Sequence, residues 1–198
     1  MSSPSLDELI SSLKCLPGVG QKSAQRMAMH LLERDQAGAR RLADAVLKSL
    51  ENIRHCSQCR NFSDTEVCDI CSRPSRDQST VCVVESPADV IAIESSAAYQ
   101  GRYFVLLGRL SPLDGYGPEQ LGLDDIEEQL KQGQIKEIIL ATSSTVEGDI
   151  TAQYVADIAS KSGVASSRLA RGIPSGGELE YIDSATLSRA LSGRQKFD

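Results

Sequence analysis

Four cysteines carry the most specific chemical signal in this sequence. Cys56, Cys59, Cys68 and Cys71 form a CxxC-x8-CxxC pattern within the segment CSQCRNFSDTEVCDICSRP. Two such pairs can place four thiolates at the corners of a tetrahedron, which is the geometry of structural Zn²⁺ sites. We therefore predict one Zn²⁺ per subunit. Because sulfur fills all four positions, none stays open for a substrate, and the predicted role of the metal is structural.

Other interpretations of the four cysteines remain open. A reduced, metal-free loop, an Fe–S cluster and a redox pair of dithiols use the same residue type. Zn²⁺ is favoured because the segment holds few apolar residues, and metal ligation can replace a core with about 10–16 kcal/mol of apparent binding free energy. The other two cysteines, Cys15 and Cys82, stand among apolar residues and are expected in the core.

A second chemical signal lies in the segment LPGVGQKSAQRMAMHLL, residues 16–32. Gly18 and Gly20 leave main-chain N–H groups unobstructed, and a helix is predicted to begin directly after them with its positive dipole end outward. Lys22 and Arg26 share one face of that helix, where they can reach neighbouring phosphates. These four residues predict a corner that binds a nucleic-acid backbone without sequence readout. An ordinary helical hairpin with two solvated cations is the alternative.

Carboxylates suggest a third kind of chemistry, Mg²⁺-assisted phosphoryl transfer. Glu85 follows a predicted strand, and Glu147 and Asp149 come shortly after another. Such chemistry needs several carboxylates to hold the metal, but the second strand ends in Ala-Thr-Ser, which carries no charge. Glu85 is therefore expected to cap the following helix or to serve a partner surface. The chain has no GxxxxGK(S/T) loop either, so ATP hydrolysis has no support.

Helices must position the glycine corner. Apolar residues recur at helical spacing on both sides of residues 17–20, which predicts two short amphipathic helices. A third helix is expected to pack on both of them and to complete a small helical module. Its apolar face would hold five residues, Ala39, Leu42, Val46, Leu50 and Ile53.

Beyond Pro74 the pattern changes to alternating strands and helices. Strands are predicted at 80–84, 103–107 and 137–142, and helices after Pro87 and around 119–130 and 147–160. This alternation predicts a parallel sheet with helices on both faces and functional groups at the carboxyl ends of its strands. After a glycine-rich loop, Asp183 or Ser184 is expected to cap a final helix that runs through Leu191.

Composition and charge narrow the function classes. The 198 residues are 40% hydrophobic and 24% charged, which is typical of a folded chain of one or two domains. The net charge of −6 argues against a generally basic nucleic-acid binder. However, residues 1–79 hold eleven Lys and Arg against ten Asp and Glu, whereas residues 80–198 hold ten against seventeen. The two halves are therefore expected to face different partners.

The sequence also bears on location. It has no apolar run long enough to cross a membrane, and its N-terminus lacks the layout of a secretory signal. We expect a cytoplasmic protein without a membrane partner. In that compartment thiols stay reduced, which favours metal ligation over disulfides for the grouped cysteines.

Taken in order, the segments resemble the RecR recombination mediator family. The resemblance covers essentially the whole chain, through the two segments quoted above and through VVESPADVIAIE, LGRLSPLDGYGPEQL, ATSSTVEGDITAQYV and RLARGIPSGGELEYIDSATLSRAL. It implies an α+β multi-module fold with four parts. These are a helix-hairpin-helix DNA-binding and dimerisation module (1–54), a Cys₄ zinc finger (55–75), an α/β Toprim domain with a parallel sheet (79–172), and a C-terminal Walker B-like segment with a helix (173–198).

The resemblance also implies partners. RecR-like proteins act with RecO, and in some systems RecF, to load RecA onto single-stranded DNA coated by single-strand-binding protein. They bind single- and double-stranded DNA and assemble as homo-oligomers, either dimers or tetrameric rings. The implied DNA contacts fall at Lys22 and Arg26, beside Gly18 and Gly20. The implied partner contact falls at Glu147, with Glu85 as a further candidate.

The sequence departs from the family pattern at two places, and one rival hypothesis for its function remains. Arg109 stands where the family commonly has glycine, and Ser143-Ser144 stands where Asn-Pro is usual, so the shape of the partner surface is expected to differ there. The resemblance implies no catalytic residue, since catalytic Toprim enzymes add an Asp-x-Asp pair that this chain lacks. The rival hypothesis is a metal-dependent phosphotransfer enzyme or nuclease that uses Glu85, Glu147 and Asp149.

Overall fold

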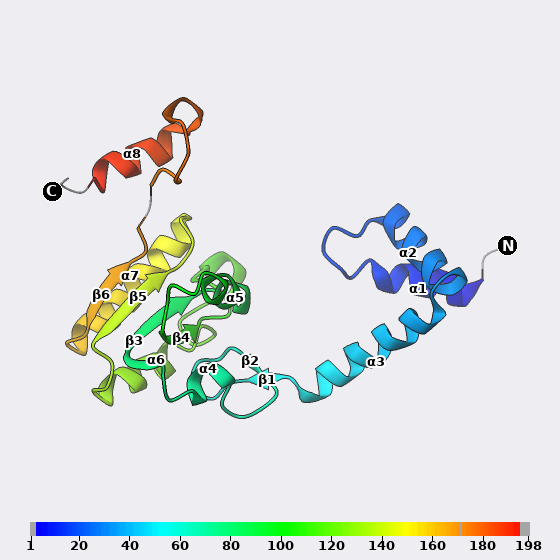
Figure 1. Ribbon diagram of the computed structural model, residues 1–198, viewed down its shortest axis with the longest axis horizontal. Coiled ribbons are helices and arrows are strands. Elements are labelled where there is room, and N and C mark those ends of the chain that lie inside the picture. Colours follow the sequence, from blue (N-terminus) through cyan, green and yellow to red (C-terminus); the bar gives the residue numbers. More distant parts are fainter. Residues whose placement is uncertain (1–2, 171, 195–198) are drawn as a thin grey trace. The chain divides into compact units, whose positions relative to one another are not determined.

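A computed structural model describes residues 3–170 and 172–194 (Figure 1). The chain forms two compact units, Met1–Ile53 and Arg54–Asp198. The first unit is helical, and the second joins a small metal-finger-like segment to a four-stranded sheet. In the described part of the chain, no helix combines the length and the apolar character that crossing a membrane requires.

The first unit consists of three helices, α1 (Pro4–Leu13), α2 (Gln21–Glu33) and α3 (Gln36–Asn52). Helices α1 and α2 pack through Ile10, Ala24 and Ala28, with partly buried leucines around them. The two alanines are small, so the helices approach closely at this point. The predicted hairpin of two amphipathic helices is therefore confirmed.

The predicted packing of the third helix is wrong within this chain. Asp35 caps α3 by accepting a hydrogen bond from Gly38 N–H, and α3 buries none of its residues. Leu42, Val46 and Leu50 are 52%, 50% and 77% exposed. The helical periodicity was correctly identified, but periodicity alone cannot say which surface covers the apolar face. We call Leu42, Val46 and Leu50 the α3 face.

The two isolated cysteines differ in their surroundings. Cys82 is buried in the sheet, as predicted. Cys15 is exposed, so its predicted place in the core is wrong. The reason is local, because Cys15 lies in the turn after the last residue of α1 and therefore beyond the apolar stripe of that helix.

The second unit begins with the elements of the cysteine-bearing segment, β1 (Arg54–His55), β2 (Phe62–Ser63) and α4 (Asp69–Ser72). A parallel sheet follows, with the strands in the order β4 (Gly101–Val105), β3 (Asp77–Val84), β5 (Glu137–Ala141) and β6 (Ala165–Arg168). Helices α5 (Pro87–Ser95), α6 (Leu123–Lys131) and α7 (Val146–Lys161) connect the strands. The predicted parallel sheet is confirmed.

Alternation along the strands creates two cores. Val81 and Val83 point to the face covered by α6 and α7, whereas Cys82 and Val84 point to the face covered by α5. Since successive side chains of a strand point to opposite faces, a strand that is buried on both sides must be apolar throughout. Strand β3 meets that condition over its last four residues, which are all buried.

Two elements differ from the sequence prediction. Strand β6, with the sequence ASSR, was not predicted, because an exposed, polar edge strand carries no hydrophobic signal. Helix α6 begins at Leu123, four residues later than expected. Its N-cap Gly122 has a φ of 65°, a left-handed conformation that favours glycine and that ends the preceding turn.

The C-terminal segment contains a short 3₁₀ turn, η2 (Leu179–Tyr181), and the helix α8 (Ser184–Ser192). Asp183 caps α8 by accepting hydrogen bonds from Ala185 N–H and Thr186 N–H, as predicted. Glu178 and Glu180, which precede it, are exposed. A second 3₁₀ turn, η1 (Pro112–Asp114), lies in the loop that leads to α6.

A buried ion pair ties α5 to the sheet. The side chain of Arg76, only 4% exposed, pairs with Glu94 of α5, and its Nη1 donates to Glu94 Oε1 at 2.9 Å. Tyr103 Oη of β4 donates to the same oxygen at 2.7 Å. The hydrogen bonds from Arg76, and then from Tyr103, hold the pKa of Glu94 below its ordinary value. One ionised carboxylate therefore joins α5 to β4 and to the residue that precedes β3.

We predict that Glu94→Gln lowers the free energy of unfolding near neutral pH by about 1–3 kcal/mol, because Arg76 loses its charged partner. Since the folded pKa lies below the unfolded one, ionised Glu94 stabilises the fold above its ordinary pKa of 4.5. That contribution disappears as the pH falls through the lower, folded pKa. Urea denaturation at several pH values should therefore show a flatter acid dependence for the variant.

Glu127→Gln is the matched control, because Glu127 pairs with Lys131 at the surface of α6. An exposed pair of this kind contributes little, so the control should unfold almost like the unmodified chain. Equal losses of unfolding free energy in Glu94→Gln and Glu127→Gln would contradict the proposed role of Glu94.

Candidate metal centre and nucleic-acid interface

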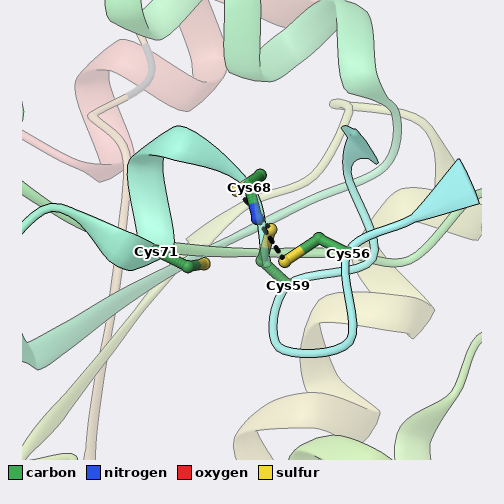
Figure 2. Close-up of side chains that lie close together, drawn as sticks. All are labelled: Cys56, Cys59, Cys68 and Cys71. Atoms are coloured by element: carbon green, nitrogen blue, oxygen red, sulfur yellow. Dashed lines mark hydrogen bonds between the residues drawn. The ribbon is translucent and has the colours of Figure 1, made fainter. Parts of the chain in front are cut away.

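The four cysteines meet at one point, as Figure 2 shows. Cys56 and Cys59 come from the loop between β1 and β2, whereas Cys68 directly precedes α4 and Cys71 lies within it. All four are buried, and their sulfur atoms lie within 4.8 Å of one another. Cys59 Sγ and Cys68 Sγ are 3.5 Å apart. The structure thus brings together the whole predicted ligand set.

Main-chain hydrogen bonds shape the loop around the sulfurs. Cys56 N–H donates to Asn61 O at 2.8 Å, which closes a tight turn, and Arg60 within that turn has a φ of 62°. Cys68 N–H donates to Cys56 Sγ at 3.3 Å. The amide thereby orients one sulfur of the cluster. The segment reaches this arrangement although it has little apolar core of its own.

The chemistry of the four thiols fits a soft divalent cation. Hydrogen bonding to Cys68, together with burial, raises the pKa of the Cys59 thiol, whereas the hydrogen bonds from Cys59 and Cys71 lower the pKa of Cys68. The sulfurs therefore share protons, since several buried thiolates repel one another. A bound cation removes that repulsion and takes all four as thiolates. Four sulfur ligands in a small buried cluster fit tetrahedral Zn²⁺.

The cysteine-bearing segment is joined to the edge strand β4. Val105 N–H donates to Cys59 O at 2.8 Å. The guanidinium of Arg60 donates to Gln120 O at 3.1 Å and lies 5.7 Å from the centre of the Phe104 ring. A Cβ atom at Gly122 would lie 1.5 Å from Arg60 Nη1, so only glycine leaves room for this contact. Sequence reasoning missed Arg60, because no spacing rule links it to residues sixty positions away.

The glycine corner of the first unit leaves main-chain donors uncovered. Gly18 has a φ of 76°, and a Cβ atom at Gly18 or Gly20 would meet nothing within 4 Å. Helix α2 begins after Gly20 without a side-chain cap. Lys22 and Arg26 are both exposed on α2. Uncapped N–H groups, the helix dipole and two cations on one face can together hold the oxygens of a phosphate backbone.

The carboxyl ends of β3 and β5 are linked by Glu85. Its Oε1 accepts a hydrogen bond from Ser143 N–H at 2.8 Å. The predicted capping of the following helix by Glu85 is wrong, because Ser86 and Asp89 form a reciprocal capping box on α5. Glu85 therefore joins two strand ends across the sheet.

The other carboxylates near this edge differ in their partners. Asp149 pairs with Arg168, whose Nη2 lies 2.6 Å from Asp149 Oδ1. Arg168 ends β6, the strand that sequence reasoning missed, so its role had no sequence signal. Glu147 lies half-buried in the first turn of α7. Within residues 3–170 and 172–194, the four cysteines are the group of three or more potential ligands that lie close enough to hold a metal ion.

The exposed face of α7 is apolar beside Glu147. Val146, Ile150 and Tyr154 recur every four residues and are 73%, 53% and 42% exposed. We call these three residues the α7 stripe. Arg109, one of the two departures from the expected family pattern, is also exposed. Apolar side chains exposed together in a row of this kind are typical of a protein interface.

Models of known protein families match this chain in the same order as the parts described above. Four family models match, described as RecR helix-hairpin-helix (residues 6–50), RecR Cys₄ zinc finger domain (53–72), Toprim domain (79–170) and RecR C-terminal (172–195). The zinc finger match covers the cysteine cluster, and the Toprim match covers the sheet.

Curated relatives match over nearly the full length. The recombination protein RecR of Alcanivorax borkumensis is 53% identical over 195 residues, which is 98% of each chain. That of Saccharophagus degradans is 53% identical over 196 residues, which is 99% of this chain and 100% of the relative. With such identity along the whole chain, and with the hairpin, the finger and the sheet in the same order, this protein belongs to the RecR family.

Proposed function

We propose that this chain is a recombination mediator without enzymatic activity of its own. In recombinational DNA repair it would act with RecO, and in some systems RecF, to load RecA onto single-stranded DNA coated by single-strand-binding protein. The family membership supports a role in recombination, because the matched relatives are named recombination proteins. The uncapped, cation-flanked start of α2 is the observation that carries the proposal.

DNA binding through this corner would be independent of sequence. The corner presents main-chain N–H groups, the ammonium of Lys22 and the guanidinium of Arg26, all of which bind phosphate oxygens. Phosphate oxygens are the same for every base, so contacts of this kind carry no sequence information. Single- and double-stranded DNA share the phosphate backbone, so both are proposed ligands.

The second unit would serve as a protein-binding surface. Residues 80–198 carry the excess of acidic residues, which repels DNA but suits a basic partner. Glu147 stands beside the apolar α7 stripe, so charge and apolar area lie together on one helix. We propose that RecO binds here, with Glu85 acting indirectly by holding the strand end near Ser143.

Self-association would cover the α3 face. Leu42, Val46 and Leu50 form an apolar row that the described part of α1 and α2 leaves exposed. A second copy of the chain offers an identical row, and two such rows can bury each other in an isologous contact. We therefore propose a homo-oligomer, a dimer or a ring built from dimers.

The rival hypothesis remains an enzyme that uses Mg²⁺ at the strand ends. The contacts of Glu85 with Ser143 N–H and of Asp149 with Arg168 weaken that hypothesis, because each carboxylate is already engaged by a donor from the chain. Mg²⁺-dependent strand cleavage or primer synthesis by the purified protein, if abolished by Glu85→Gln, would favour the enzyme instead.

We predict about one Zn²⁺ per chain, held by the four cysteines. Cys59→Ser or Cys68→Ser should lower the zinc content, measured by elemental analysis, and should make residues 54–74 more susceptible to proteolysis. Cys15→Ser is the control, because Cys15 is exposed and lies outside the cluster. Full zinc content in a Cys56→Ser/Cys71→Ser double variant would refute the assignment.

We predict that Lys22→Ala and Arg26→Ala each weaken DNA binding for all sequences alike. Each lost phosphate contact should reduce the slope of log affinity against log salt concentration by about 1 on double-stranded DNA. Fluorescence anisotropy over a series of salt concentrations measures both quantities. Lys48→Ala, an exposed change of equal charge on α3, is the control. A folded double variant with unchanged affinity and slope would place the DNA elsewhere.

We predict that Glu147→Lys weakens RecO binding by about tenfold, equivalent to about 1.4 kcal/mol, because an attraction becomes a repulsion. Zinc content and oligomeric state should stay unchanged. Calorimetry with purified RecO measures the affinity, and Glu128→Lys on the exposed side of α6 controls for the change in total charge. Normal affinity in Glu147→Lys, or an equal loss in both variants, would remove Glu147 from the interface.

A further inference from the structure

A polar cavity of about 410 Å³ lies between the zinc finger and the edge strand β4. Ser57 of the finger and Arg102 of β4 contribute to its walls. Five further polar side chains are amides, from Gln58, Gln78, Gln129, Gln132 and Gln134, and Cys71 of the cysteine cluster, Val81, Tyr103 and Ile135 complete the lining. Arg102 is the one charged residue in this lining, and no carboxylate accompanies it. Neither Glu85 nor Glu147 lines this cavity, and the proposed function does not use it.

The free edge of β4 supplies main-chain groups to this cavity. Leu106 N–H donates to Val84 O of β3, whereas Val105 N–H donates outward to Cys59 O. Because successive residues of an edge strand direct their N–H and C=O groups alternately, those of Tyr103 must also point outward. Arg76 Nη1 donates a hydrogen bond to the outward carbonyl of Gly101. Tyr103 thus lies between Gly101 and Val105, and an outward main-chain group of each already has a hydrogen-bond partner.

Only the main chain of Tyr103 can face the cavity with its hydrogen-bonding groups. Its ring belongs to the core under α5, and its hydroxyl group donates to Glu94. In the described residues, no partner takes up Tyr103 N–H or C=O on the outward side. One donor and one acceptor, spaced as in a β-ladder, therefore line the cavity.

Arg102 has an unused donor. Its Nε atom is buried without a hydrogen-bond partner in the described part of the chain. The Nε–H and one Nη–H of a guanidinium form a side-on pair that matches the two oxygens of a carboxylate. A buried donor without a partner is costly, so a ligand that supplies an acceptor once the guanidinium turns toward the cavity gains free energy.

The lining excludes several ligand classes. A divalent cation would meet Arg102 and no carboxylate. A nucleobase would find no aromatic ring on which to stack, since the Tyr103 ring lies on the other face of the sheet. Amide side chains around a strand edge instead suit another peptide, whose main chain needs both donors and acceptors.

We propose that this cavity binds a short, extended peptide segment of a partner protein that bears a carboxylate. The peptide main chain would pair with Tyr103 N–H and C=O and so extend the sheet locally at β4. Its carboxylate would accept the side-on hydrogen bonds of Arg102, and the glutamine amides would bind the remaining peptide groups. Gln129, whose Nε2 donates to Gln58 O at 2.8 Å, holds the rim of the cavity.

Nitrogen-15 NMR of the full chain tests the proposal with N-acetyl-trialanine as the probe. At about 5 mM, where a complex of millimolar affinity is mostly formed, the Tyr103 amide and the Arg102 Nε–H should shift and saturate. The C-terminal amide of the same peptide should bind about tenfold more weakly, because it lacks the charge-assisted pair. This comparison uses the unmodified chain and depends on no variant.

Variants test the role of Arg102, and other probes test which kind of ligand the cavity binds. Arg102→Gln should bind the acid and the amide equally, whereas Arg73→Gln, an exposed control, should still discriminate between them. The proposal is overturned if the acid peptide causes no saturable shift, or if Arg102→Gln discriminates as before. It is also overturned if acetate alone or oligothymidylate shifts the Tyr103 amide as the peptide does, since these results indicate a simple anion site or a DNA site.

Discussion

The hydrogen bond from Val105 N–H to Cys59 O is the contact on which the organisation of the second unit depends. It joins the cysteine loop to the last residue of the edge strand β4. Arg60, against Phe104 and Gln120, and Gln129, against Gln58, reinforce the same junction. The loop has no core apart from its sulfurs, so their ligation determines whether Cys59 O is in place. A metal that takes no part in chemistry can therefore control the edge of the sheet.

A second constraint separates the binding roles. The strand ends of the sheet, where many α/β proteins bind ligands, are held together by Glu85 with Ser143 N–H and by Asp149 with Arg168. The carboxylates of Glu85 and Asp149, which could bind a cation, here hold parts of the fold together. The groups that we propose to bind phosphate lie instead in the first unit, at Lys22 and Arg26. Contacts with DNA and with protein partners can thus act through different surfaces of one chain.

Local rules predicted much of this arrangement. Cysteine spacing identified the metal ligands, and apolar periodicity identified α1, α2 and β3, because these signals depend on neighbouring residues. Contacts between distant residues escaped prediction, as Arg60 with Gln120 and Arg168 with Asp149 show. The polar strand β6 and the exposed Cys15 were missed because edges and turns carry no hydrophobic signal. The α3 face was misassigned because its periodicity does not name its partner.

Hydrogen exchange measured by mass spectrometry, before and after zinc removal with a chelator, tests the central claim most directly. If the finger holds the sheet edge, chelation should increase exchange in residues 54–73 and also in residues 101–106, which comprise β4 and the residue after it. Strand β5, residues 137–141, lies on the far side of β3 and should keep its protection. Unchanged protection of residues 101–106 in the zinc-free protein would contradict the account, because the finger would then be an appendage that the sheet does not need.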